Sequence, residues 1–136
     1  SIPYLNEMVE SALLEVPHGS KSIFYVGTSL GGWYTSKIAR LYHAPAILIN
    51  PSVNPSDSLE KYHIDQNILD GYKRFGQIDF SPEDHVFLAS NDEVIPYQYA
   101  HLHATQKGST VHIDHNAGHR FNGPEFQLII DLINKG

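Results

Sequence analysis

The amino-acid sequence predicts a three-layer α/β fold, in which a mostly parallel β-sheet carries helices on both faces. Short runs of β-branched and aromatic residues recur along the chain and are apolar on both faces, which is typical of strands buried between helices. Helical patterns alternate with these runs, which indicates right-handed crossovers between parallel strands. The chain of 136 residues has the length of one domain with one hydrophobic core. We therefore expect residues 1–136 to form a single domain.

The predicted elements alternate along the chain. Strands are expected over 22–26, 46–49, 86–89 and 110–113. Helices are expected over 3–16, from Ser29 onward, over 97–106 and over 124–134. In the helix that follows Ser29, the spacing of Ile38 and Leu41 places both side chains on the face expected to meet the core.

Composition excludes several classes of function. The chain has 9 Lys plus Arg against 15 Asp plus Glu, a formal net charge of -6, and no basic block. This balance argues against binding to nucleic acid or to an anionic membrane surface. The absence of cysteine excludes disulfides and thiolate metal sites. No apolar run approaches the ~20 residues that span a bilayer, and no secretory signal is visible, so we expect a cytoplasmic protein.

The stretch from Lys21 to Ala39 contains the most informative motif. Gly27-Thr28-Ser29-Leu30-Gly31 lies between a predicted strand and a predicted helix. A G-x-S-x-G sequence in this context is the nucleophile elbow of α/β-hydrolases. The tight turn strains the serine backbone and lifts its hydroxyl clear of the sheet, while glycines on either side avoid collisions with backbone. The unpaired N–H groups at the helix start point at the oxygen that the serine would attack.

Two further residues complete a catalytic constellation. A serine hydroxyl needs a base, and the base needs an orienting carboxylate. Ser29 follows the first predicted strand, Asp92 the third and His119 the fourth. Because parallel strands end at the same edge of a sheet, all three side chains are expected to meet there. The chain order Ser, Asp, His is that of α/β-hydrolases.

The carboxylate has rivals. Asp84 lies before its strand and is expected at the wrong edge. Glu93 is adjacent to Asp92 but points elsewhere. Asp114 lies beside the histidine loop and is the serious alternative.

The base must be chosen among nine histidines. Gly118 before His119 and an apolar residue two positions later fit a short loop that swings one imidazole over the sheet edge. His112 lies within a strand and His115 earlier in the loop, so both are expected to be ordinary histidines. A metal site is not expected. His101 and His103 diverge on a helix, and the set of 112, 115 and 119 lacks the helical spacing of metalloproteases.

The predicted insertion and the exit loops indicate where a pocket would form. The polar stretch from Asp57 to Gln77 predicts one or two helices after the second strand, and we expect a lid over residues 56–78. Trp33 is expected either to line this pocket or to pack against neighbouring side chains. Asn50 orients its loop or forms an Asx-turn, and Val94 lies in the third exit loop. These three residues are the candidate pocket residues.

The motifs resemble those of a known family. The segments GTSLGGWYTSKIARLYHAPAILINPSVNP, ASNDEVIPY and HNAGHRF look like the small bacterial α/β-hydrolase esterases of the YqiA type, from Gly27 to the C-terminus. The resemblance implies Ser29 as nucleophile, Asp92 as triad acid and His119 as general base. It also implies hydrolysis of small-molecule acyl esters, or thioesters, without a cofactor.

The chain also departs from that family. Its members begin with a strand and a His-Gly-Phe loop, which supplies one oxyanion N–H, and the backbone N–H of Leu30 would supply the other. Neither strand nor loop is found before Ser1, so we expect a sheet that lacks its N-terminal strand. The apolar strand 22–26 would then be an exposed edge, which predicts pairing with another chain in a homo-oligomer.

Two other functions are compatible with these features. The chain could be an incomplete or non-catalytic α/β-hydrolase-fold subunit or binding module. Alternatively, the same triad could serve a thioesterase, a perhydrolase or an amidase.

Overall fold

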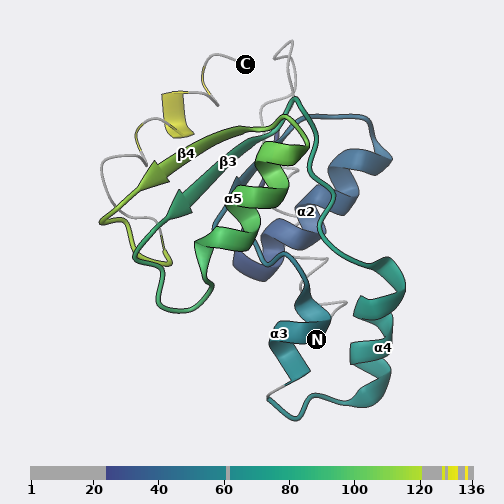
Figure 1. The fold of residues 1–136 in the computed structure, drawn as a ribbon. Helices are drawn as coiled ribbons and strands as arrows, with labels where there is room; N and C mark the ends of the chain where they lie inside the picture. Colours follow the sequence, from purple (N-terminus) through teal and green to yellow (C-terminus); the bar gives the residue numbers. More distant parts are fainter. Residues whose placement is uncertain (1–23, 61, 121–126, 128, 132–133, 135–136) are drawn as a thin grey trace.

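The computed structural model describes residues 24–60, 62–120, 127, 129–131 and 134 (Figure 1). Four strands form one parallel sheet in the order β1-β2-β3-β4. Their bounds are β1 Tyr25–Thr28, β2 Ala46–Ile49, β3 His85–Ala89 and β4 Thr110–Asp114. The helices between them are α2 Ser29–Leu41, α3 Pro55–Glu60, α4 Gln66–Phe75 and α5 Tyr97–Gln106. The α/β architecture expected from the alternating pattern is therefore confirmed.

Most element bounds agree with the sequence prediction. The strand over 46–49 and the helix over 97–106 are found as predicted, while β3 begins one residue earlier and β4 ends one residue later. The first strand is displaced, because Gly27 and Thr28 pair with Leu48 and Ile49 and so continue the sheet up to the turn. The predicted helix over 3–16 and residues 22–23 lie outside the described residues.

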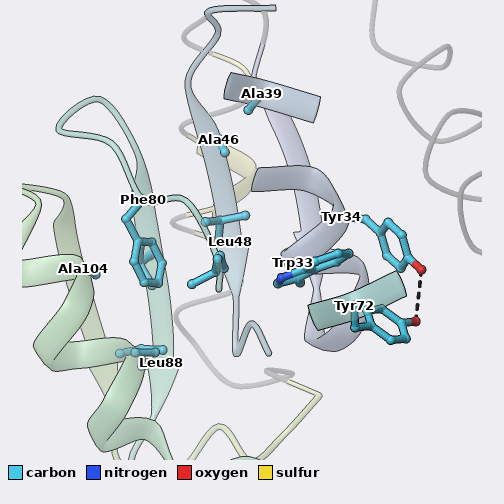
Figure 2. Close-up of a cluster of buried hydrophobic side chains, with 12 residues drawn as sticks. Trp33, Tyr34, Ala39, Ala46, Leu48, Tyr72, Phe80, Leu88 and Ala104 are labelled. Carbon is cyan, nitrogen blue, oxygen red and sulfur yellow. Dashed lines mark hydrogen bonds between the residues drawn. The ribbon is translucent and has the colours of Figure 1, made fainter. Parts of the chain in front are cut away.

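The two faces of the sheet bury alternate side chains. One face packs against α2 and α5, and Figure 2 shows the cluster that forms there, which Tyr72 of α4 joins beside α2. From the central strands it receives Ala46, Leu48, Val86 and Leu88. The opposite face receives Ile47, Ile49, Phe87 and Ala89, which pack with Ala117 and Ile129. Apart from His85 at the start of β3, both central strands are thus apolar, which is the pattern that predicted burial on both sides.

The prediction for Leu41 was wrong. Its side chain is 71% exposed, whereas Ala39 is fully buried and Ile38 is half-buried. Successive residues of an α-helix are separated by about 100°, so Leu41 lies about 200° from Ala39 around the helix axis. Small side chains rather than large apolar ones therefore bring α2 close to the sheet.

Two histidines lie among the apolar residues of the second face. The rings of His85 and His112 stack, with Nδ1 of the first 3.2 Å from Nε2 of the second, and His112 also stacks on Phe87. Burial lowers the pKa of His85, and the charge of Asp84 offsets part of this shift. A neutral imidazole suits this apolar surrounding.

The insertion after β2 contains two helices, as predicted. α3 and α4 lie side by side, apart from the sheet (Figure 1). The segment that follows α4 runs along α2, where Trp33 Nε1 donates to the carbonyl of Gly76 at 2.9 Å and Lys37 binds Asp79. The role of this insertion as a lid stays a prediction.

Among the described strands, β1 forms one edge of the sheet and β4 the other. The pairing of β1 with another chain therefore stays a prediction. In the part of the chain that the structure describes, every helix is too short or too polar to span a lipid bilayer.

The N-terminal edge of the sheet is held by a buried ion pair. Asp84 is fully buried and accepts two hydrogen bonds from the guanidinium of Arg40, at 2.8 and 2.9 Å. Its oxygens also accept from the backbone N–H groups of Ala46 and Ser81, each at 2.9 Å. One carboxylate therefore joins α2, β2 and the approach to β3, which agrees with the prediction that Asp84 lies at the edge away from the candidate triad.

We expect Asp84→Asn to lower the free energy of unfolding by about 3 kcal/mol, because removing one charge of a buried pair leaves the other uncompensated. Urea denaturation measures this loss. The matched control is Asp79→Asn, which removes the exposed pair with Lys37 and should cost about 0.5 kcal/mol. Equal losses for the two variants would contradict the structural role of Asp84.

Candidate active site

Ser29 stands at a sharp reversal of the backbone between β1 and α2. Its φ is 54°, in the left-handed region that side chains other than glycine rarely adopt. The preceding Thr28 is still extended, with φ -123° and ψ 147°. The carbonyl of Ser29 accepts a hydrogen bond from the N–H of Ser52 at 2.9 Å, which ties the turn to the loop after β2. Backbone strain of this kind persists only where surrounding structure fixes it, and it clusters at functional sites.

Two glycines allow this reversal. A Cβ at Gly27 would lie 2.6 Å from the carbonyl oxygen of Gly31 and would overlap the side chain of Thr35. A Cβ at Gly32 would lie 2.8 Å from Cβ of Pro51. The first close approach follows from the elbow motif. The second, between α2 and the loop after β2, could not be read from the sequence.

The structure brings Ser29, Asp92 and His119 into one hydrogen-bonded chain. His119 Nδ1 lies 2.8 Å from Asp92 Oδ2, and its Nε2 lies 3.1 Å from Ser29 Oγ. The Asp92 side chain is 1% exposed, and its other oxygen accepts from the N–H groups of Val94 and Ile95 at 2.8 and 3.0 Å. With the carboxylate fixed in this way, the favoured tautomer places the proton on Nδ1 and leaves Nε2 to accept from the serine hydroxyl.

The other acids weighed from the sequence have different partners. Asp114 accepts from the N–H of Asn116 at 2.7 Å, and Glu93 is exposed. Asp84 binds Arg40 at the opposite edge. Of these four candidates, Asp92 is the one that binds His119.

The other histidines of this region also have local partners. His115 Nδ1 lies 2.6 Å from the hydroxyl of Ser90, and His112 stacks on Phe87. In α5, the ring of His101 stacks on Tyr97. These contacts agree with the expectation that they are ordinary structural histidines.

The loop that carries His119 is held by two asparagines. Asn50 is 2% exposed, and its Nδ2 donates to the carbonyls of Gly118 and His119 at 3.1 and 2.7 Å. Asn91 Oδ1 accepts from the N–H of Gly118 at 2.9 Å. The sequence placed Asn50 among the candidate pocket residues, and in the structure its amide is buried against the loop that carries His119. Asn91 was missed, although it lies in the loop between the end of β3 and Asp92.

Two cavities lie near these residues. The first, of about 490 Å³, lies between α2 and α4. Trp33 lines it, together with Tyr34 and Tyr72, whose hydroxyls are 3.0 Å apart. Burial, with the hydrogen bond to Tyr72, raises the pKa of Tyr34 well above its usual value. None of the three residues of the hydrogen-bonded chain lines this cavity.

The second cavity adjoins the candidate site. It has a volume of about 510 Å³ and lies between the loop after β2 and the start of α5, with Val94 in its wall as expected for a pocket residue. Ser52, which also lines it, is hydrogen-bonded to the Ser29 carbonyl. Val94 and Ile95 bind the Asp92 carboxylate through their N–H groups. Both walls are therefore attached directly to residues of the hydrogen-bonded chain.

Comparison with known proteins gives one family and several structural relatives. Residues 4–134 match the family model described as Uncharacterised protein family (UPF0227). Among solved structures, a hydrolase of the alpha/beta superfamily from Xanthomonas campestris is 17% identical, with a TM-score of 0.62, and the match covers 98% of this chain and 66% of that one. The chain thus spans slightly less than two thirds of the length of this relative.

Two other solved structures share the fold. Alpha/beta hydrolase domain-containing protein 10 from mouse is 15% identical, with a TM-score of 0.57, and the match covers 96% of this chain and 70% of that protein. The Bacillus cereus carboxylesterase is 19% identical, with a TM-score of 0.50, and the match covers 98% of this chain and 58% of that one. These similarities show that the chain shares the fold of these proteins.

We expect Gly27→Ala to destabilise the protein by about 3 kcal/mol, because the added methyl group meets backbone and a buried side chain in a packed turn. Urea denaturation measures the loss. Gly76→Ala is the comparison, since Gly76 has φ 76° but open space where its Cβ would be. It should cost about 1 kcal/mol through backbone conformation alone. A smaller loss at position 27 than at position 76 would contradict the packing assigned to the turn.

Proposed function

Because the chain belongs to the UPF0227 family and has the fold of the α/β-hydrolases, we propose that it is a serine esterase. The membership agrees with the resemblance to the YqiA-type esterases. The observation that carries the proposal is the hydrogen-bonded chain from Ser29 through His119 to Asp92, at the C-terminal edge of the sheet. We propose acyl esters of small molecules as the substrates.

In the proposed reaction, His119 Nε2 takes the proton of Ser29 while Oγ bonds to the carbonyl carbon of the ester. The tetrahedral intermediate then breaks its bond to the alcohol, which leaves with the proton held on Nε2. Water next gives a proton to the same nitrogen and attacks the acyl-enzyme. This second step releases a carboxylic acid and restores the Ser29 hydroxyl. Asp92 stays ionised and stabilises the imidazolium that forms in both steps.

The start of α2 supports the negative charge that develops on the carbonyl oxygen. Ser29 is the first residue of the helix, so the N–H of Leu30 lies in the first turn. In that turn no helical carbonyl is available to accept a hydrogen bond from it. We assign this N–H to the oxyanion site. A donor of this kind is worth about 10²–10³ in rate in a protease in which one has been removed.

The cavity beside the site supports uncharged esters as substrates. Val94, Ile95, Pro96 and Tyr99 form an apolar wall, while Asp57 is the carboxylate among the lining residues. No Lys or Arg is found among the described residues that line it. An anionic group in this cavity would meet the carboxylate of Asp57, with His103 as the basic side chain among the lining residues, and this arrangement disfavours its desolvation.

Labelling with a fluorophosphonate tests the proposed nucleophile. The wild-type protein should gain the mass of one phosphonyl group on Ser29, because the probe reacts with an activated serine oxygen. Ser29→Ala should not be labelled, and its rate of hydrolysis of a short p-nitrophenyl ester should fall by about 10⁴-fold or more. Ser36→Ala, which changes a serine buried against the Trp33 carbonyl, is the matched control. Equal labelling of wild type and Ser29→Ala would rule out the proposed chemistry.

Replacement of the two rival carboxylates tests the acid. Asp92→Asn should lower kcat by about 10²–10⁴-fold, because an amide disfavours the tautomer that leaves Nε2 free to accept a proton. Asp114→Asn keeps an oxygen able to accept from Asn116 and should change kcat by less than about threefold. Steady-state kinetics on the same ester measure both. The reverse order of effects would assign the acid role to Asp114.

A further inference from the structure

We infer that Asn50 is a positioning residue that fixes the backbone of His119, so that the imidazole reaches Ser29. The side-chain amide of Asn50 is hydrogen-bonded to the backbone that carries the imidazole ring. Because the inference rests on the proposed function, it is tested together with the reactivity of Ser29.

Asn50 uses both the nitrogen and the oxygen of its side-chain amide. The two Nδ2 hydrogens are donated to the carbonyls of Gly118 and His119, and Oδ1 accepts from the N–H of Ala89 at 2.8 Å. One side chain at the end of β2 therefore joins the end of β3 to the loop after β4. Because it is 2% exposed, each of these bonds is protected from water, and losing one would leave a buried polar group unpaired.

The residue type suits this position for two reasons. Asn50 has φ 42°, in the left-handed region that asparagine tolerates better than most side chains. Its amide also combines donor and acceptor on a short stem. A carboxylate of the same shape could accept from Ala89 but could not donate, and it would face two carbonyl oxygens.

His119 is thus constrained at two points by different residues. Asn50 binds its backbone carbonyl at 2.7 Å, and Asp92 binds its ring at 2.8 Å. With the main chain and the far side of the ring both fixed, Nε2 can lie only near its observed position, 3.1 Å from Ser29 Oγ. Displacements of about 1 Å in such an arrangement cost about 10²-fold in rate.

The experiment compares three substitutions in the full chain, with a short p-nitrophenyl ester as substrate. Asn50→Asp removes both donated bonds and keeps the acceptor. Asn50→Gly removes the whole side chain and suits the left-handed backbone, so it keeps the test valid if Asn50→Asp does not fold. Asn67→Asp, at an exposed position of α4, is the control for an added negative charge. Circular dichroism establishes which variants are folded.

We expect kcat to fall by about 10–100-fold in Asn50→Asp and Asn50→Gly, with KM within about threefold of wild type, and no change in Asn67→Asp. For Asn50→Asp, the ratio of its rate to that of wild type should rise as the pH falls. The carboxyl introduced there regains a donor when it is protonated, and burial against carbonyls favours that form. Asn50→Gly should show a constant ratio. A purely structural role would change the melting temperature without these effects on kcat.

The outcomes separate the inference from the proposed function. If wild-type Ser29 is labelled by the fluorophosphonate but folded Asn50→Gly retains kcat within about threefold, the inference fails and the esterase proposal stands. If wild-type Ser29 is not labelled and no ester is cleaved, the proposed function fails, and the positioning role fails with it. If neither Asn50 variant folds, the amide is a requirement of the fold and the positioning role is rejected.

Discussion

The site depends on a reversal of the backbone at Ser29, where an extended strand becomes a helix within one residue. The left-handed φ of 54° is unfavourable for serine by about 1–2 kcal/mol, so the surrounding structure must maintain it. Gly27 lets α2 approach the strand, and Ser52 holds the Ser29 carbonyl from the neighbouring loop. The turn projects the hydroxyl beyond the sheet edge, where an imidazole from the far strand can meet it.

The two edges of the sheet carry different kinds of interaction. At the N-terminal edge, Asp84 and Arg40 form a buried pair that joins α2 to the central strands. At the C-terminal edge, charged and polar side chains converge on His119. Parallel strands make this separation possible, because each crossover returns the chain to the same starting edge. Stabilising interactions at one edge therefore leave the chemistry at the other free to use strained and polar groups.

Much of the fold could be predicted from sequence because its signals are local. The apolar run over 46–49 identified a strand buried on both faces, and the G-x-S-x-G turn fixed the positions of strand and helix around Ser29. Because Ser29, Asp92 and His119 each follow a predicted parallel strand, the sequence also placed the three at one edge. The hydrogen bonds from Asn50 to the His119 loop had no local sequence signal, since the two carbonyls that accept them lie 68 and 69 residues along the chain. Leu41 was misplaced because spacing alone cannot tell which face of α2 carries the small residues that approach the sheet.

The hydrogen bonds at the C-terminal edge follow the order of the strands. Ser52 N–H binds the Ser29 carbonyl, and the amide of Asn50 binds the backbone of Ala89 and of the His119 loop. The backbone of Ser90 in turn binds that of Asp114. Each loop is thus fixed by its neighbour.

The insertion is attached differently. It begins after these bonds, at Pro55, and is held mainly along α2, through Trp33 and Lys37. The wall of the second cavity is shared between the two parts, because Asp57 and Gln77 come from the insertion while Val94 comes from the loop that binds the Asp92 carboxylate. The residues of the hydrogen-bonded chain could be inferred from sequence motifs, whereas the lining of the cavity could not, because it joins segments that lie far apart in the sequence.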